Sequence, residues 1–186
     1  ALLTRLFHDN GAIWVKFGQF LSSRTDVLPP QYVNELQKLQ NDAKPTSFRK
    51  IEKVLIEEWG GQWRERFAEF NETPVAAASV AQVHRATLVS GERVAVKIQL
   101  PHARRLFKQD SAVFKALAAV GAPMISHFDL RQVIDQIVEI TLQELDFLQE
   151  EANLKKFEVL PHGPRIHVPH LFAEMSTARV LVTEWI

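Results

Sequence analysis

The sequence contains no cysteine, no excess of charge of either sign and no long apolar run. Without cysteine, disulfides and thiolate metal sites are excluded, and a reducing compartment is expected. Lysine plus arginine and aspartate plus glutamate number 22 each, so the chain lacks the basic excess typical of nucleic-acid binding. No apolar run approaches the roughly 18 to 20 residues that span a bilayer, and nothing resembles a signal peptide. We therefore expect no nucleic-acid partner and no transmembrane segment.

The composition is that of a globular protein with a real core. Hydrophobic residues make up 46% and charged residues 24% of the 186 residues, which are ordinary shares for a soluble domain. The length suits one domain or a compact half of a larger one. Because the first residue is alanine, we expect a processed or excised chain.

Apolar residues recur at helical spacing through the first third of the chain and predict helices there. From Pro74 the pattern changes to strands. Residues 80–89 and 93–99 are strand-like runs that flank Ser90-Gly91, a turn signal that predicts a β-hairpin.

Further helices and two strands are expected after the hairpin. Periodic runs cover residues 103–120 and 129–157, and strand-like runs cover residues 165–172 and 178–186. This order of elements predicts an α+β fold in which helices pack on a small antiparallel sheet.

The strand at residues 93–99 places a lysine on one face of the expected sheet. Alternation puts one set of side chains on one face and the other set opposite: Val94, Val96 and Ile98 against Ala95, Lys97 and Gln99. A small residue two positions before a lysine leaves room for a flat ring, and the ammonium acts as a point charge on phosphates. A solvated lysine on an exposed strand face explains the letters V-A-V-K equally well.

Four carboxylates lie close together in the second periodic run: Glu144, Asp146, Glu150 and Glu151. On one ideal helix at about 100° per residue, Asp146 and Glu150 share a face, whereas Glu144 and Asp146 lie about 200° apart. The latter two cannot serve one site unless the helix bends or each faces a different partner. A solvated acidic face is the simpler interpretation, and Glu150 as the partner of Lys97 is the sharper one.

Four short motifs follow one another along the chain. They are K-x-G-Q at residues 16–19, an alanine-rich loop at 76–84, the lysine strand at 94–101 and E-x-D at 144–146. In this order they resemble the UbiB family of atypical protein-kinase-like proteins, also described as aarF-domain kinases. Glu150 and Asn153 fall at later positions of the family pattern.

The resemblance implies a kinase-like N-lobe with a small antiparallel sheet. Residues 1–72 would form a helical K-x-G-Q extension packed against that lobe. Residues 73–186 would form the lobe itself and end at the hinge, with the C-lobe absent.

The resemblance also implies a site for ATP or ADP. Lys97 would contact the phosphates and be oriented by a glutamate, although Glu151 stands where the family usually has a small residue, so Glu150 and Glu151 both stay candidates. Thr183 would gate the rear of the pocket, and backbone groups at the hinge would meet the adenine. The residues implied to bind the nucleotide are Ala76, Ala77, Ala78, Ser79, Lys97, Glu150, Glu184 and Ile186.

The implied catalytic residues are Lys16, Gln19, Glu144 and Asp146. Mg²⁺ is expected in the full-length protein, but no H-x-D or D-F-G motif occurs in this chain, so its ligands are expected elsewhere. We read His162, His167 and His170 as surface residues at strand ends rather than as a metal site. The chain is therefore expected to bind half of a nucleotide and to catalyse nothing alone.

A loop of alanines in place of glycines has a physical consequence. Glycine reaches φ > 0 and lets backbone N–H groups approach phosphate, whereas alanine restricts these angles. We expect a stiffer loop that disfavours phosphotransfer to proteins and still permits nucleotide binding.

The resemblance implies an atypical kinase or ATPase that acts on a small molecule and supports ubiquinone or related isoprenoid-quinone biosynthesis. Its partners would include a precursor lipid and quinone-biosynthesis proteins. It would lie at the cytoplasmic face of a bacterial inner membrane, or in a mitochondrion or plastid, with peripheral membrane contact. A nucleotide-switched scaffold and a lipid-binding module remain the alternatives. In the latter, Trp14, Phe17 and Phe20 would contact lipid, although a core position explains these aromatics more simply.

Overall fold

The computed structural model describes residues 2–9, 12–23, 29–40, 45–121, 130–161, 163 and 165–186. Packing divides the chain into two compact units, Ala1–Ala43 with His102–Leu142 and Lys44–Pro101 with Gln143–Ile186. We call them the helical unit and the sheet unit and describe each by itself. The predicted domains, residues 1–72 and 73–186, have other bounds and stay a prediction.

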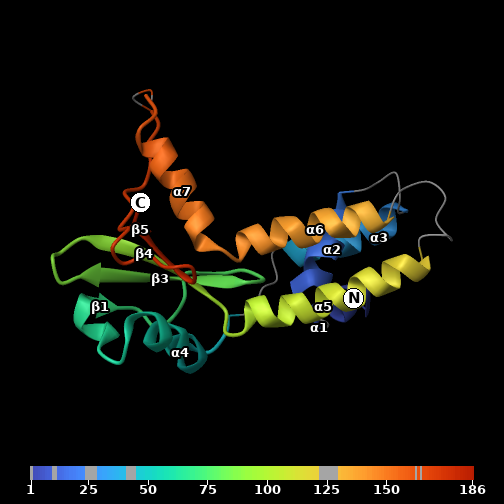
Figure 1. Cartoon of the computed structure of the whole chain (residues 1–186), viewed down its shortest axis with the longest axis horizontal. Coiled ribbons are helices and arrows are strands. Elements are labelled where there is room, and N and C mark those ends of the chain that lie inside the picture. Colours follow the sequence, from blue (N-terminus) through green and yellow to red (C-terminus); the bar gives the residue numbers. More distant parts are fainter. Residues whose placement is uncertain are drawn as a thin grey trace. The chain divides into compact units, whose positions relative to one another are not determined.

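Five strands form one antiparallel sheet in the described part of the sheet unit (Figure 1). In chain order they are β1 (Phe67–Phe70), β2 (Ala76–Ala77), β3 (Ala81–Leu88), β4 (Arg93–Gln99) and β5 (Val180–Glu184). The order across the sheet is β1-β3-β4-β5, and β2 also pairs with β3. The predicted α+β fold is confirmed.

The predicted hairpin is formed by β3 and β4. At its turn the Leu88 N–H donates to the carbonyl of Glu92 over 2.9 Å. Gly91 adopts a φ of 102°, an angle that disfavours any residue with a side chain. Glycine at this position therefore allows the two strands to follow each other directly.

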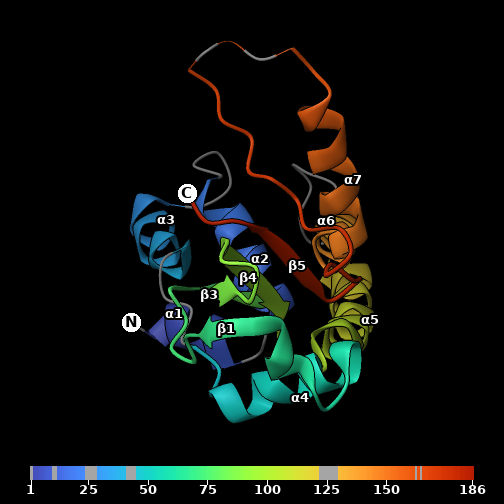
Figure 2. The same ribbon diagram turned by 90° about the vertical axis from the view of Figure 1, so that its left-hand side faces the viewer.

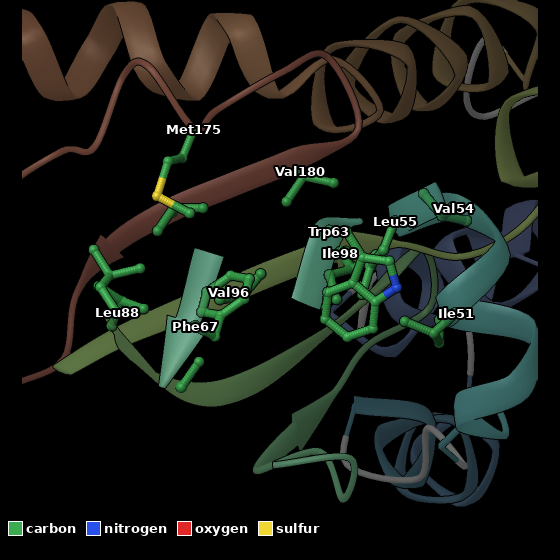
Figure 3. Close-up of a cluster of buried hydrophobic side chains, with 13 residues drawn as sticks. Ile51, Val54, Leu55, Trp63, Phe67, Leu88, Val96, Ile98, Met175 and Val180 are labelled. Atoms are coloured by element: carbon green, nitrogen blue, oxygen red, sulfur yellow. The ribbon is translucent and has the colours of Figure 1, made fainter. Parts of the chain in front are cut away.

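One face of the sheet forms the main hydrophobic core and is covered by helix α4 (Phe48–Trp59) (Figures 1 and 2). Trp63, from the 3-10 helix η2 (Trp63–Arg66), fills the space beside α4. Figure 3 shows side chains from the sheet, α4, η2 and the segment before β5 meeting there: Ile51, Val54, Leu55, Trp63, Phe67, Leu88, Val96, Ile98, Met175 and Val180. The alternation predicted for β4 is confirmed, because Val94, Val96 and Ile98 are fully buried on this face.

The opposite face of the sheet carries helix α7 (Phe147–Glu158) (Figures 1 and 2). Phe147 is buried there against Ala81 of β3 and Leu181 of β5. The last four residues of α7 are exposed, so only the first part of the helix covers the sheet. Ala95 and Lys97 of β4 stay half-buried on this side.

The single helix predicted for the periodic run at residues 129–157 does not form, and the run is divided into two helices. Helix α6 (Leu130–Glu144) ends before α7 begins, and Asp129 lies outside the described residues. Asp146 caps α7, because its Oδ1 accepts the Leu148 N–H over 3.2 Å. The spacing of Asp146 and Gln149 fits a capping box, so the sequence carries a signal for the start of α7.

The strand predicted at residues 165–172 does not form. Only Leu171 bridges to Thr183 of β5, and Pro169 has no N–H with which to extend a ladder. The prediction also missed β1 and β2, which are only four and two residues long.

The helical unit contains α1 (Leu2–Asp9), α2 (Ala12–Ser22), α3 (Pro30–Gln37), the 3-10 helix η1 (Lys38–Gln40), α5 (Ala103–Gly121) and most of α6. Helix α2 packs against α1, α3 and α5. Gly18 makes this packing close, because a Cβ there would overlap Leu39 Cδ1 and lie 2.8 Å from Phe7 Cδ1. The glycine of K-x-G-Q therefore has a packing role.

The aromatic residues of α2 pack inside the helical unit. The rings of Trp14 and Phe17 meet that of Phe114 with centroid distances of 4.5 and 5.0 Å. The interpretation of these two residues as core is thus confirmed, and Phe20 is half-buried. In the part of the chain that the structure describes, no helix has the length and apolarity to cross a bilayer.

Candidate functional site

The centre of the candidate site is an ion pair between β4 and α7. Lys97 Nζ lies 2.5 Å from Glu150 Oε2, and the two side chains are 33% and 44% exposed. The ammonium also lies 4.9 Å from the ring centroid of Phe147, a distance at which the ring face attracts a cation. Glu151 bonds Lys155 instead, at 2.6 Å, so Glu150 is the glutamate that pairs with Lys97.

Glu150 reaches Lys97 because the start of α7 is tied to the sheet. The buried amide of Gln99 on β4 donates to the Leu145 carbonyl over 2.9 Å. The Phe147 N–H donates to the carbonyl of Ala178, just before β5, over 3.2 Å. These bonds fix the first turn of α7 over the strand that carries Lys97.

Residues 76–79, which we call the alanine-rich loop, form a tight hairpin with the start of β3. Ala76 pairs with Val83 of β3, and Val83 lies directly opposite Lys97. The Ala78 N–H donates to the Ala81 carbonyl over 2.8 Å, which leaves only two residues at the tip. That N–H is therefore engaged within the hairpin.

The tip of this hairpin is held to the sheet. Val80 is buried, and its carbonyl accepts the Leu100 N–H over 2.8 Å. Among the described residues other than glycine, only His102 has a positive φ, so the loop uses ordinary backbone angles. The role predicted for Ala76, Ala77, Ala78 and Ser79 over the phosphates stays a prediction.

The end of β5, predicted to be the hinge, is held by two histidines. The Glu184 N–H donates to the His170 carbonyl over 2.8 Å. Glu184 Oε2 accepts the His170 N–H at 3.2 Å and lies 2.8 Å from His167 Nε2. These hydrogen bonds, that from the His170 N–H first, lower the pKa of the Glu184 carboxyl.

The two histidines are surface residues, as predicted, yet they also hold the Glu184 side chain, which the sequence did not reveal. His162 lies outside the described residues. Thr183 lies opposite Ala95 of β4, and Ile186 is exposed. Binding of adenine by Glu184 and Ile186 stays a prediction.

The E-x-D carboxylates lie on either side of the helix break. Glu144 is exposed at the end of α6, and half-buried Asp146 caps α7. The break removes the restriction of an ideal helix, in which the two would point in opposite directions.

The K-x-G-Q residues lie on α2 of the helical unit. Gln19 Nε2 donates to the Leu39 carbonyl over 3.1 Å, which ties α2 to η1. The helix includes Lys16, whose side chain lies outside the described part. A shared catalytic role for Lys16, Gln19, Glu144 and Asp146 joins two packing units and stays a prediction.

Within the described ranges, no group of three or more His, Asp or Glu side chains could hold a metal ion. The prediction that Mg²⁺ is bound by groups outside this chain is untested.

The antiparallel sheet, Lys97 on β4 and Glu150 on α7 define a kinase-like fold. The chain belongs to the family described as the ABC1 atypical kinase-like domain, whose model matches residues 38–186. The resemblance found in the sequence is confirmed.

Relatives named as aarF domain-containing protein kinases are similar to nearly the whole chain. An uncharacterized aarF domain-containing protein kinase of Arabidopsis thaliana, named as chloroplastic, is 37% identical over 189 residues, and AarF domain-containing protein kinase 1 of Mus musculus is 33% identical over 178 residues. These alignments cover 100% and 95% of this chain but 27% and 34% of the relatives. The chain therefore spans about a third of the length of such relatives.

A solved structure is similar as well. Rv3197 of Mycobacterium tuberculosis, in a complex with erythromycin, is 38% identical and superimposes with a TM-score of 0.64. The match covers 91% of this chain and 43% of Rv3197.

Proposed function

We propose that the full-length protein binds ATP or ADP through this chain and acts as an atypical kinase or ATPase on a small molecule. The Lys97–Glu150 ion pair, at 2.5 Å, is the observation that carries the proposal. A lysine oriented by a helix glutamate is the arrangement that holds nucleotide phosphates in kinase-like folds. Both side chains are partly exposed, so phosphates can reach the ammonium.

The face of the sheet beside Lys97 suits a flat ring. Ala95 lies between Arg85 of β3 and Thr183 of β5, and its methyl group leaves space above the strand. The half-buried side chain of Val83 adds an apolar contact on the same face. These features support adenine binding between the alanine-rich loop and the end of β5.

The reaction itself requires more than this chain. We propose that Mg²⁺ and the groups that position the acceptor are supplied by the rest of the full-length protein. With them, the protein would support ubiquinone or related isoprenoid-quinone biosynthesis, with a precursor lipid and biosynthetic proteins as partners. The membrane or organelle location inferred from the sequence belongs to the same proposal, and the chloroplastic name of the Arabidopsis relative supports a plastid in some organisms.

The test is thermal stabilisation of the full-length protein by nucleotide. ADP or MgATP at about a hundredfold its dissociation constant should add about 2.7 kcal/mol to the free energy of unfolding. Lys97→Ala should abolish this gain, because it removes the phosphate-binding charge. A wild-type protein that gains no stability from either nucleotide contradicts the proposal.

A matched pair of variants separates Glu150 from its neighbour. Glu150→Gln should weaken nucleotide binding roughly tenfold, because the Lys97 ammonium loses its charged partner. Glu151→Gln breaks the pair with Lys155 four residues on in α7, and such helix pairs contribute about 0.2–0.5 kcal/mol. Equal effects of the two variants on the dissociation constant would show that the pair does not orient Lys97.

A further inference from the structure

Two polar side chains are buried in the apolar core on the α4 side of β3. Gln82 is 1% and His84 0% exposed. The His84 ring stacks on Phe70 with a centroid distance of 5.4 Å, and the edge of Phe48 meets it at 5.6 Å. Polar groups in such surroundings are costly unless every donor and acceptor finds a partner.

A chain of hydrogen bonds supplies those partners and fixes the His84 proton. The Thr46 N–H can only donate, so the atom it meets at 3.0 Å is Gln82 Oε1. The Gln82 NH₂ group therefore faces His84 Nε2 at 2.8 Å, and this nitrogen must accept. The proton lies on Nδ1, which donates to the Asn71 carbonyl over 2.8 Å.

This chain of bonds connects both ends of the link that leads into the alanine-rich loop. Asn71 directly follows β1 and begins that link. Ala77, near its other end, pairs with Gln82 itself. His84 therefore holds the start of the link through the Asn71 carbonyl, and Gln82 lies opposite Ala77, near the end of the link, in the pairing of β2 with β3.

The pair also determines which residue of β3 faces Lys97. Val83, between Gln82 and His84, points to the opposite face and lies in one row with Ala76 and Lys97. A shift of one residue would turn every side chain of β3 to the other face. The Thr46 N–H and the Asn71 carbonyl would then face Val83, which has no polar atom in its side chain, and would lose their hydrogen bonds.

We propose that Gln82 and His84 are positioning residues that set the register of the alanine-rich loop against Lys97 while His84 is neutral. The effect of this pair on nucleotide affinity rests on the proposed function, whereas the effect of the pair on the loop does not. A protonated His84 would direct a second N–H at the Gln82 NH₂ group. Turning that amide would only move the clash to the Thr46 N–H.

The charges around His84 lie outside this core. Glu72 follows Asn71, and Arg64 of η2 pairs with Glu72 at 2.7 Å and with Glu52 of α4 at 3.1 Å. The Glu72 charge and the bond to Asn71 favour the protonated ring, but burial outweighs them and lowers the pKa of His84. The ring is therefore neutral at neutral pH.

The first test measures the loop without nucleotide. Amide hydrogen exchange is followed in the full-length protein at Val75 and Ala78, whose N–H groups donate to β3 carbonyls over 2.8 Å. In Gln82→Met both should exchange about tenfold faster, the size expected from losing one buried hydrogen bond. Val54→Ala, a core change on α4, should leave them at wild-type rates once corrected for global stability.

Conservative variants separate the two bonds of His84. His84→Asn retains a donor at the position of Nδ1, and His84→Gln retains a polar atom at the position of Nε2. Each should protect Val75 and Ala78 better than His84→Leu does. If a His84 variant does not fold, ring ¹⁵N shifts of the wild type decide, because the proposal requires a neutral Nδ1–H tautomer at about pH 7.5.

Unchanged exchange at Val75 and Ala78 in Gln82→Met, or an Nε2–H tautomer, overturns the proposal. The second test is ADP affinity, which Gln82→Met should weaken about tenfold and Val54→Ala should not change. If wild type binds no nucleotide, the proposed function fails and the exchange test still decides the role in the loop. If the loop loosens but affinity is unchanged, its register does not govern the nucleotide site, and that part of the proposal is overturned.

Discussion

At the scale of single residues, the sheet unit depends on where a few polar groups find partners. Lys97 has Glu150, and Glu151 has Lys155. His84 is buried among aromatic rings and is held as a neutral donor and acceptor. The partners of Lys97 and of His84 Nδ1 come from other elements of the unit, whereas Glu151 and Lys155 pair within α7.

The buried imidazole predicts a dependence of stability on pH. Burial lowers the pKa of His84 below its ordinary value of 6.5. Just below pH 6.5 this ring is therefore protonated more in the unfolded chain than in the folded chain. The free energy of unfolding should therefore fall as the pH drops below about 6.5, by at most about 1.4 kcal/mol per pH unit for this one group. Urea denaturation at about pH 7.5 and about pH 5.5 measures the change.

The comparison with His84→Asn isolates this histidine from the others. The variant cannot titrate in this range, so the difference in stability between the two pH values should be smaller than in wild type. A difference of the same size in both proteins would assign the pH dependence to other groups.

At the scale of elements, the break between α6 and α7 determines the site. A continuous helix would carry Glu150 along the axis of α6, whereas the capped start at Asp146 lets α7 begin anew on the sheet. The Gln99 amide on β4 donates to the Leu145 carbonyl over 2.9 Å and so ties the break to the sheet. The direction of α7 thus follows from a cap and a bond to a strand.

Removing the cap tests this account. Asp146→Ala should destabilise the protein by about 1 kcal/mol, because the Leu148 N–H loses its acceptor. Asp146→Asn keeps a good cap without the charge and should cost only a few tenths of a kcal/mol. Chemical denaturation of the three proteins gives the differences, and an equal loss in both variants would mean that charge, not capping, holds the start of α7.

At the scale of the whole molecule, the chain divides into two units that each combine distant segments. The helical unit joins the N-terminal helices with α5 and most of α6, and the sheet unit joins α4 and the hairpin with α7 and β5. The candidate nucleotide site lies in the sheet unit, and the K-x-G-Q helix lies in the helical unit. Nucleotide binding should therefore affect the two units differently.

Hydrogen exchange with and without ADP checks this difference in the full-length protein. We expect slower exchange at residues 76–79 and 183–186 in the presence of ADP, because ligand contacts suppress local opening. Helix α1 should exchange at the same rate in both conditions. Protection confined to the helical unit would place the nucleotide elsewhere, and Lys97→Ala serves as the control that should lose the protection.

The sequence by itself determined the features that depend on local pattern. Period-two alternation identified the buried face of β4, and the turn signal at Ser90-Gly91 identified the hairpin, because these depend on neighbours along the chain. Four motifs in order also identified the family, which the comparisons confirm. The sequence identified Lys97, but the departure from the family pattern at Glu151 left both Glu150 and Glu151 as candidates for its partner.

Only the tertiary structure decided which of Glu150 and Glu151 pairs with Lys97. Glu150 meets Lys97 because α7 begins anew at the Asp146 cap and a bond from Gln99 ties its start to β4, and this long-range bond is not visible from the pattern along the helix. The network of Gln82 and His84 likewise joins residues up to 38 positions apart, from Thr46 to His84. Such contacts form only when separate elements pack together, which is why residue patterns along one segment do not specify them.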